Sequence, residues 1–171
     1  RFSSVASFFA ATMLVSLSFS AISQLRHMEH GMLNMIPVFI GSWATDTCAY
    51  FAGYFFGKHK LAPRLSPKKS IEGSIGGIVG AALVGAAFGA YMDYALAIGN
   101  LTIVLAIVGG VGSVISQVGD LAASVIKREN QIKDFGNILP GHGGIMDRFD
   151  SCIFVLPTIY CILKLLATYT A

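Results

Sequence analysis

The sequence predicts an all-α, polytopic integral membrane protein, a bundle of about five transmembrane helices. Of its 171 residues, 54% are hydrophobic and only 12% are charged. An average soluble domain carries about twice that charged fraction. The apolar residues also come in runs of ~20, the length a helix needs to cross a bilayer. We therefore expect one membrane-embedded domain over residues 1–171.

The first predicted span covers residues 3–25 and begins almost at Arg1. The segment after it, QLRHMEH, is not a small-residue cleavage site, so this run is not read as a signal peptide. Because the chain starts with Arg rather than Met, we expect it to be a fragment or to lack its start.

The second predicted span, 32–56, contains the acidic residue Asp46. A carboxylate in a spanning helix is costly and usually faces a polar cavity or a partner. Ser42, Tyr50 and Gly53 share its helix face. This predicts a polar groove that opens toward the cytoplasm. Pairing of Asp46 with a buried basic residue, or a hydrogen bond between helices, is the alternative.

The third and fourth predicted spans, 71–92 and 97–123, are rich in glycine. The third contains the small-x-x-x-small pairs Gly73/Gly77, Gly76/Gly80 and Gly85/Gly89. Such pairs let helix backbones approach closely in lipid, so we expect tight packing here. A nucleotide-binding fingerprint is not expected, because it would need a preceding strand.

The fifth predicted span, 145–168, follows a polar stretch that reads KDFGNILPGHGGIMDRFDS. If five spans alternate, ten of the twelve Lys and Arg residues lie on one side. They are Arg1 and the basic residues of loops 57–70 and 124–148. Basic residues concentrate in cytoplasmic loops, so both loops are predicted to be cytoplasmic.

Two further acids lie at the ends of predicted spans on that side, Asp120 and Asp147. A carboxylate at a helix start can simply complement the helix dipole, and this alternative stays open for Asp147 or Asp150 taken individually. Together with Asp46 and two basic loops, however, the acids indicate phosphate chemistry. Mg²⁺ is bound by a few carboxylates, Lys and Arg neutralise phosphate, and the GHGG stretch can present backbone N–H groups to an oxyanion.

His142 within GHGG could act as a base or a phosphate donor, or it could be a turn histidine with local hydrogen bonds. Zinc is not expected, because the sequence has no H-x-x-x-H or C-x-x-C motif. Cys48, Cys152 and Cys161 are interpreted as packing residues.

The segment SVIKRENQIKDFGNILPGHGGIMDRFDS resembles the signature of the phosphatidate cytidylyltransferases, also called CDP-diacylglycerol synthases. The matching positions are Ser124, Lys127, Arg128, Lys133, Asp134, Gly136, Pro140, Gly141, His142, Gly143, Gly144, Asp147, Arg148 and Asp150. The resemblance is strong over residues 40–155 and weaker over the outer spans. The family has further N-terminal spans, so we expect that this cytidylyltransferase domain lacks them.

The resemblance implies transfer of CMP from CTP to phosphatidic acid, which yields CDP-diacylglycerol and pyrophosphate. It implies Mg²⁺ as cofactor, with a second cation left open, and Asp120 and Asp147 as metal ligands. The implied catalytic residues are Asp120, Asp147, Lys127 and Arg148. The implied substrate-binding residues are Asp46, Lys68, Lys69, Arg128, Lys133, His142, Gly143 and Gly144.

The expected partners are CTP, phosphatidic acid and the lipid bilayer, with a homodimer left open and no nucleic acid. The expected location is a bacterial-type inner membrane with the active site facing the cytoplasm. One alternative is an ion-coupled transporter, since intramembrane acids also mark ion pathways. The charges gather on one face, however, and no internal repeat is visible. A related CDP-lipid synthase or a polyprenol kinase-like enzyme is the other alternative.

Overall fold

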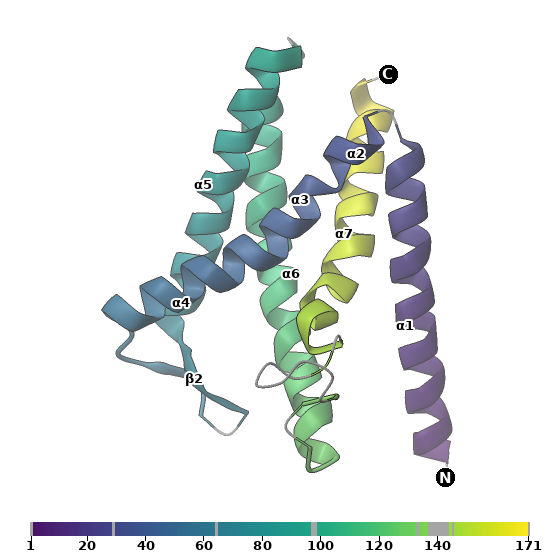
Figure 1. Ribbon diagram of the computed structural model, residues 1–171, viewed down its shortest axis with the longest axis vertical. Coiled ribbons are helices and arrows are strands. Elements are labelled where there is room, and N and C mark those ends of the chain that lie inside the picture. Colours follow the sequence, from purple (N-terminus) through teal and green to yellow (C-terminus); the bar gives the residue numbers. More distant parts are fainter. Residues whose placement is uncertain are drawn as a thin grey trace.

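Four long α-helices dominate the computed structural model, which describes residues 2–28, 30–63, 65–96, 99–132, 134–136, 144 and 146–170. These helices are α1 (Phe2–His27), α5 (Ile71–Leu96), α6 (Leu101–Glu129) and α7 (Met146–Thr170). Each contains a stretch long and apolar enough to cross a membrane. They lie side by side in the order α1, α7, α6 and α5 (Figure 1). The predicted all-α membrane bundle is confirmed.

The predicted second span, 32–56, is helical but broken. It consists of α2 (Gly31–Asn34), α3 (Ile36–Phe39), the π-helix η1 (Ile40–Ala44) and α4 (Thr45–Phe56). Pro37 contributes to the break, because it has no N–H to donate. Within the described residues, four helices rather than the five predicted are therefore continuous candidates for a membrane span. The broken segment crosses the bundle obliquely (Figure 1).

Close backbone contact between helices rests on glycine, as the small-residue pairs predicted. A Cβ atom at Gly85 of α5 would lie 2.2 Å from the carbonyl oxygen of Leu105 in α6. Likewise, a Cβ atom at Gly41 of η1 would lie 3.2 Å from the Cα atom of Gly112 in α6. Because glycine has no side chain, α5 and η1 can both lie directly against α6. The second contact also brings the following helix, α4, toward the C-terminal half of α6.

A small β-hairpin joins α4 to α5. Strands β1 (Lys60–Ala62) and β2 (Ser66–Ser70) pair antiparallel, with Lys60 opposite Ser70 and an irregularity in register. Glu72 in the first turn of α5 accepts hydrogen bonds from the backbone N–H groups of Lys58 and His59 at 3.1 and 3.2 Å. The hairpin is therefore fastened at its base to the start of α5.

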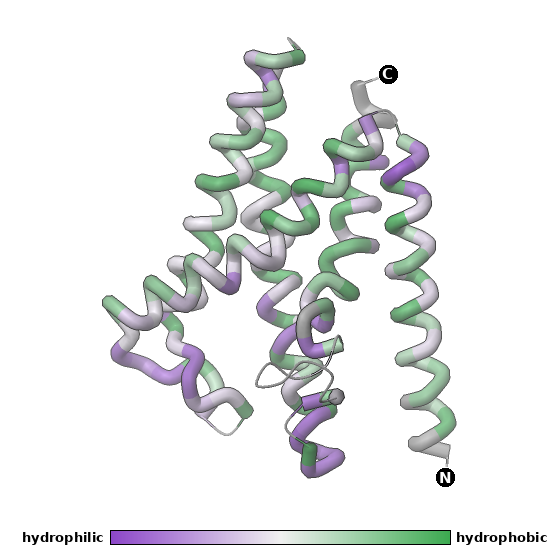
Figure 2. The backbone as a smooth tube through the Cα atoms, in the orientation of Figure 1, coloured by the Kyte–Doolittle hydropathy of each residue, from purple (hydrophilic) through white to green (hydrophobic). Residues whose placement is uncertain are grey.

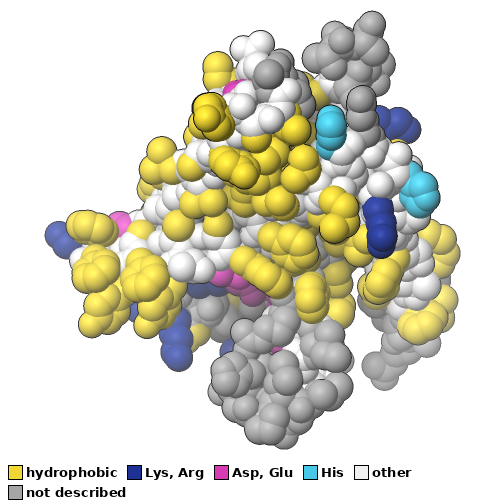
Figure 3. All heavy atoms as spheres, turned by 45° about the horizontal axis from the view of Figure 1, so that its top comes forward, with side chains coloured by type: hydrophobic (Ala, Val, Ile, Leu, Met, Phe, Trp, Pro, Cys, Tyr) yellow, Lys and Arg dark blue, Asp and Glu magenta, His cyan; other side chains and the backbone are white. Residues whose placement is uncertain are grey.

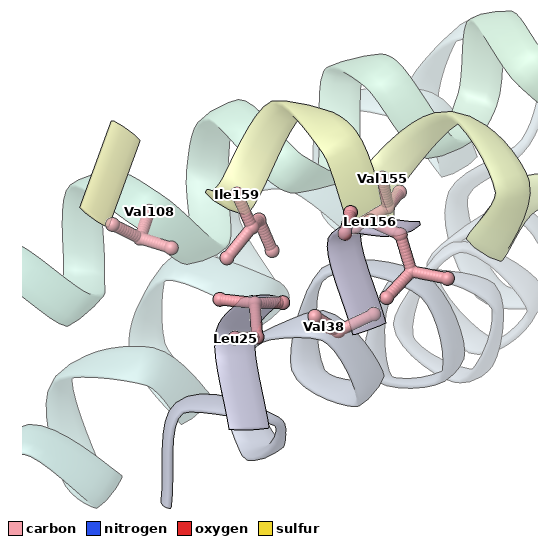
Figure 4. Close-up of a cluster of buried hydrophobic side chains, with 7 residues drawn as sticks. Leu25, Val38, Val108, Val155, Leu156 and Ile159 are labelled. Carbon is pink, nitrogen blue, oxygen red and sulfur yellow. The ribbon is translucent and has the colours of Figure 1, made fainter. Parts of the chain in front are cut away.

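The hydrophobic core lies between α1, α3, α6 and α7. Its buried side chains are Ala21, Leu25, Val38, Val108, Val155, Leu156 and Ile159, most of them labelled in Figure 4. These residues converge from distant parts of the sequence, so the core fixes α7 against both α1 and α6.

Hydrophilic residues gather at one end of the bundle. The hairpin and the C-terminal part of α6 lie at this end, and the middle of α5 and α6 is predominantly hydrophobic (Figure 2). The N-terminus of α1 lies at the same end (Figure 1). The described parts of the two basic loops therefore share one side of the molecule, as predicted. Their cytoplasmic orientation stays a prediction.

Candidate functional site

Acidic and basic side chains meet at the polar end, where β2, α4, α6 and α7 come together. Lys69 of β2 forms an ion pair with Asp120 of α6. Lys127, two turns further along α6, forms an ion pair with Asp147 of α7, with 3.0 Å between Nζ and Oδ1. These two pairs tie the hairpin and the start of α7 to the same helix.

Lys127 lies at the centre of the second pair. Besides Asp147, its Nζ atom contacts Oδ2 of Asp150 at 3.5 Å, and it lies 5.1 Å from the centre of the Phe135 ring. Its side chain is only 13% exposed. A poorly hydrated ammonium group needs compensation by opposite charge, and two carboxylates and an aromatic face supply it here.

Asp147 fastens the segment before α7. Its Oδ2 atom accepts hydrogen bonds from the backbone N–H groups of Phe135 at 2.8 Å and Gly144 at 3.0 Å, and its Oδ1 atom accepts one from Lys127. Asp147 precedes the apolar span of α7, which begins at Phe149. Partial burial acts to raise the pKa of Asp147, but the donors at Gly144, Lys127 and Phe135 outweigh it and hold the pKa below its ordinary value.

One more carboxylate, that of Asp46, approaches two of the acids in these pairs. Asp46 of α4 lies close enough to Asp120 and Asp150 for their charges to interact, and also to Lys69. Asp150 is 8% exposed and one turn along α7 from Asp147. Like charges at short range repel, so this arrangement favours binding of cations.

A first pocket, of about 490 Å³, lies between α4, the hairpin and α5. Its lining residues are Asp46, Ala49, Tyr50, Gly53, Tyr54, Lys60, Leu61, Lys68, Lys69, Ser70, Gly73, Ser74 and Gln117. The predicted groove along α4 is thus present through Asp46, Tyr50 and Gly53. Ser42 is not part of this lining. It is buried, donates a hydrogen bond to the carbonyl of Val38 and lies 3.1 Å from the sulfur of Cys152.

A second pocket, of about 260 Å³, lies between the N-terminal half of β2 and the C-terminal end of α6. Its lining residues are Leu65, Ser66, Pro67, Lys68, Ser124, Lys127, Arg128 and Asp134. Lys68 lines both pockets. Five of the predicted site residues therefore line one or both pockets: Asp46, Lys68, Lys69, Lys127 and Arg128.

The oxygen donors of this site fit Mg²⁺ as a hydrated ion shared with a substrate. Over the part of the chain that is described, no three His, Cys, Asp or Glu side chains are grouped to hold a metal by themselves. Mg²⁺ seldom uses such a cage and keeps several water or phosphate ligands. Asp120 is 28% exposed and lies one turn after Ser116, whose buried hydroxyl has no hydrogen-bond partner among the described residues. An accessible carboxylate beside an unpaired hydroxyl suits a water-bearing cation.

The structure brings together many, but not all, of the residues predicted for the site. It places Asp46, Lys68, Lys69, Asp120, Lys127, Arg128, Gly144 and Asp147 at the polar end. Lys133, His142, Gly143 and the side chain of Arg148 lie outside the described residues. The roles assigned to all of these residues, including Asp120 and Asp147 as metal ligands, stay predictions.

Some residues of the site were not among those predicted. Asp150 contacts Lys127, and Gln117 donates a hydrogen bond to the carbonyl of Ser74 at 3.1 Å in the wall of the first pocket. Helical spacing offered a signal for both, because Gln117 lies three residues before Asp120 and Asp150 three residues after Asp147. The same spacing applied to Tyr54, which lies four residues after Tyr50 of the predicted groove, and Lys60 belongs to the basic loop 57–70.

Comparison with known proteins identifies the same family that the signature segment resembles. A family model described as "Cytidylyltransferase family" matches residues 1–166. The chain is 40% identical over 157 residues to a phosphatidate cytidylyltransferase from Staphylococcus saprophyticus, with 90% of this chain and 59% of the relative covered. It is 37% identical over 156 residues to the phosphatidate cytidylyltransferase of Bacillus subtilis, covering 91% of this chain and 56% of the relative. The chain thus spans somewhat more than half the length of these relatives.

Proposed function

Because this chain belongs to the cytidylyltransferase family, we propose that it transfers CMP from CTP to phosphatidic acid, giving CDP-diacylglycerol and pyrophosphate. The named activity of relatives at about 40% identity supports this substrate pair. A nucleotidyltransferase also suits a membrane protein whose charged residues converge beside two pockets at one end of the bundle.

One observation carries the proposal beyond the family name. Residues of the signature segment, Lys127, Asp147 and Asp150, form a connected set of ion pairs, and a second pair joins Asp120 to Lys69 of the hairpin. The cations neutralise phosphate oxygens, and the carboxylates hold these cations in place. The site can therefore bind two phosphorylated substrates at adjacent positions.

The proposed reaction needs no nucleophile from the protein. An oxygen of the phosphatidate phosphate attacks the α-phosphorus of CTP, the bond between that phosphorus and the β-bridging oxygen breaks, and its electron pair leaves with pyrophosphate. Lys68, Lys69 and Lys127 hold the phosphates and offset the charge on the leaving oxygens. Asp147 keeps Lys127 and the neighbouring backbone N–H groups in position. Bound Mg²⁺, held by Asp120 and Asp147, would supply further stabilisation of that charge.

We also propose that the polar end faces the cytoplasm, with the four long helices in a bilayer of the bacterial inner-membrane type. The concentration of basic residues in the hairpin and after α6 supports this orientation. Light scattering of the purified protein would decide between a monomer and the homodimer left open by the sequence.

A panel of lipid phosphates tests the proposed function. The purified protein is incubated with CTP, Mg²⁺ and phosphatidate, an isoprenoid-type lipid phosphate or no lipid, and pyrophosphate release is measured. We expect release with phosphatidate only. Release with another lipid in place of phosphatidate would favour a related CDP-lipid synthase, and absence of release with every lipid would refute the proposal.

A further inference from the structure

The two pockets that share Lys68 of β2 differ in chemistry. The pocket beside α4 combines aromatic and aliphatic side chains with lysines, and Tyr50 and Tyr54 form much of its outer wall. The pocket beside α6 is bordered mainly by hydroxyl, charged and proline residues, among them Ser124 and Arg128. Two substrates of unlike chemistry, one lipid and one nucleotide, match two such pockets.

The wall of the first pocket continues onto an exposed aromatic surface of α4. The rings of Tyr50 and Tyr54 lie nearly parallel, with centroids 6.4 Å apart, and Tyr54 in turn contacts Phe55 edge to face. Tyr54 and Phe55 are 74% and 69% exposed. Figure 3 shows hydrophobic side chains gathered at this end of the molecule with basic side chains at their edge. Tyrosines beside lysines are typical of the level of lipid head groups in a membrane interface.

Lysines line the inner side of the same pocket. Lys60 on β1, with Lys68 and Lys69 on β2, faces the space that the two tyrosines border. A lipid that enters beside α4 would keep its glycerol and upper acyl chains against the aromatic wall, and its phosphate would reach the lysines. A free nucleotide has no acyl chain to place against such a wall.

The second pocket offers the contacts that a triphosphate requires. Arg128, Lys127 and Lys68 supply positive charge, and Ser124 and Ser66 supply hydroxyl donors. Asp134, from the segment after α6, borders the same space. The α6 residues that line this pocket belong to the C-terminal part of the helix. Figure 2 shows that this part is hydrophilic, so a water-soluble substrate can approach from there.

We propose that the pocket between α4 and the hairpin binds the phosphate monoester of the lipid substrate, that the pocket between β2 and α6 binds the nucleotide triphosphate, and that Lys68 contacts the phosphates of both. The assignment rests on the proposed function and deepens it. It places the attacking oxygen on one side of Lys68 and the α-phosphorus on the other, so the new phosphorus–oxygen bond forms at the strand. Pyrophosphate then leaves from the side of Arg128.

Equilibrium binding to purified protein in detergent tests the assignment without turnover. Dioctanoyl phosphatidate and CTP are titrated separately against variants of each pocket. We expect Tyr54→Ala and Lys60→Ala each to weaken phosphatidate binding about tenfold and to leave CTP binding unchanged. Arg128→Ala should weaken CTP binding and leave phosphatidate binding unchanged. Lys68→Ala should weaken the binding of both ligands.

Neighbouring residues provide matched controls. Phe55→Ala removes an aromatic ring of similar size and exposure next to Tyr54, and Lys58→Ala removes the same charge from the same loop as Lys60, but neither residue lines the pocket. Both controls should bind phosphatidate normally.

Glycerol 3-phosphate and inorganic phosphate are added as competitors, and we expect neither to displace the lipid at equal concentration, because they lack the part that contacts the tyrosines.

The assignment is overturned if Tyr54→Ala and Lys60→Ala weaken CTP binding instead, if the controls lose as much lipid affinity as the pocket variants, or if the unmodified protein binds no phosphatidate. Displacement by glycerol 3-phosphate would overturn the claim that the first pocket recognises a lipid, and it would indicate a site for phosphate in general. If both ligands bind as assigned but no CMP is transferred, the proposed function fails and the pocket assignment stands.

Discussion

Replacement of Asp147 by Asn isolates the electrostatic part of the site, because the side chain keeps its shape and loses its charge. In the structure this carboxylate accepts three hydrogen bonds, from the N–H groups of Phe135 and Gly144 and from Lys127, at 2.8, 3.0 and 3.0 Å. The side chain is only 8% exposed, so water replaces these contacts poorly. Lys127 would keep Asp150 as its remaining carboxylate partner.

The size of the effect follows from these three bonds. A hydrogen bond to a charged group contributes about 1 kcal/mol more than a neutral one. Asn has only one acceptor oxygen, so it can keep the two amide bonds in neutral form but then loses the bond from Lys127. The total is at least about 3 kcal/mol, which is roughly a hundredfold or more in rate if the ordered arrangement is required for the chemical step. The global fold should survive, since α7 is held against α1 and α6 by its buried apolar residues.

The assay measures two quantities for the variant and for the unmodified protein: the initial rate of CMP transfer, and the rate of hydrogen exchange at the amides of Phe135 and Gly144. We expect Asp147→Asn to lose about two orders of magnitude in rate and to exchange faster at these two amides. Glu129→Gln serves as a control near the end of α6, because Glu129 is exposed and lines neither pocket. A near wild-type rate with unchanged protection of both amides would refute the reasoning.

Three further outcomes are expected. Asp120→Asn should also lower the initial rate of CMP transfer by a factor on the order of 10²–10³. The double variant with Asp147→Asn should be little slower than either single variant, because the two carboxylates act as one unit. Additive losses in the double variant would contradict this. Gly109→Ala should lower stability in detergent by about 1–3 kcal/mol, because its Cβ atom would lie 2.5 Å from the carbonyl oxygen of Ala81 in α5. Gly110→Ala should not, because the nearest atom to its Cβ would be the Cβ atom of Ala82 at 3.8 Å; equal unfolding temperatures would argue against the close packing. A cysteine at Pro63 in the hairpin should react with an impermeant thiol reagent only from the cytoplasmic side, and labelling of intact cells from outside would reverse the orientation.

The sequence predicted the long helices well, because runs of apolar residues and small-x-x-x-small pairs report directly on burial in lipid. It did not predict the break between Gly31 and Thr45. The apolar pattern there is continuous, and only Pro37 and Gly41 hint at a change. Within the π-helix, Gly41 packs directly against Gly112 of α6, and local sequence does not contain such a tertiary contact.

The sequence also did not predict which residues, far apart in the chain, form ion pairs. Lys69 and Asp120 are 51 positions apart, so their ion pair follows from how the hairpin folds back on α6. The spacing of Asp147 and Asp150 did place both on one face of α7, yet only the structure shows that they share Lys127. Residue types thus indicated phosphate chemistry, and the fold determined which acid meets which base.

Transfer of isotope from CTP to lipid tests the central claim most directly. Purified protein is supplied with phosphatidate, Mg²⁺ and CTP that carries ³²P at either the α or the γ position. The account predicts that the α label enters the lipid with one pyrophosphate released per labelled lipid, and that the γ label stays with pyrophosphate. Entry of the γ label into lipid would reveal a kinase, absence of label from lipid in both cases would exclude group transfer, and either result would contradict the account.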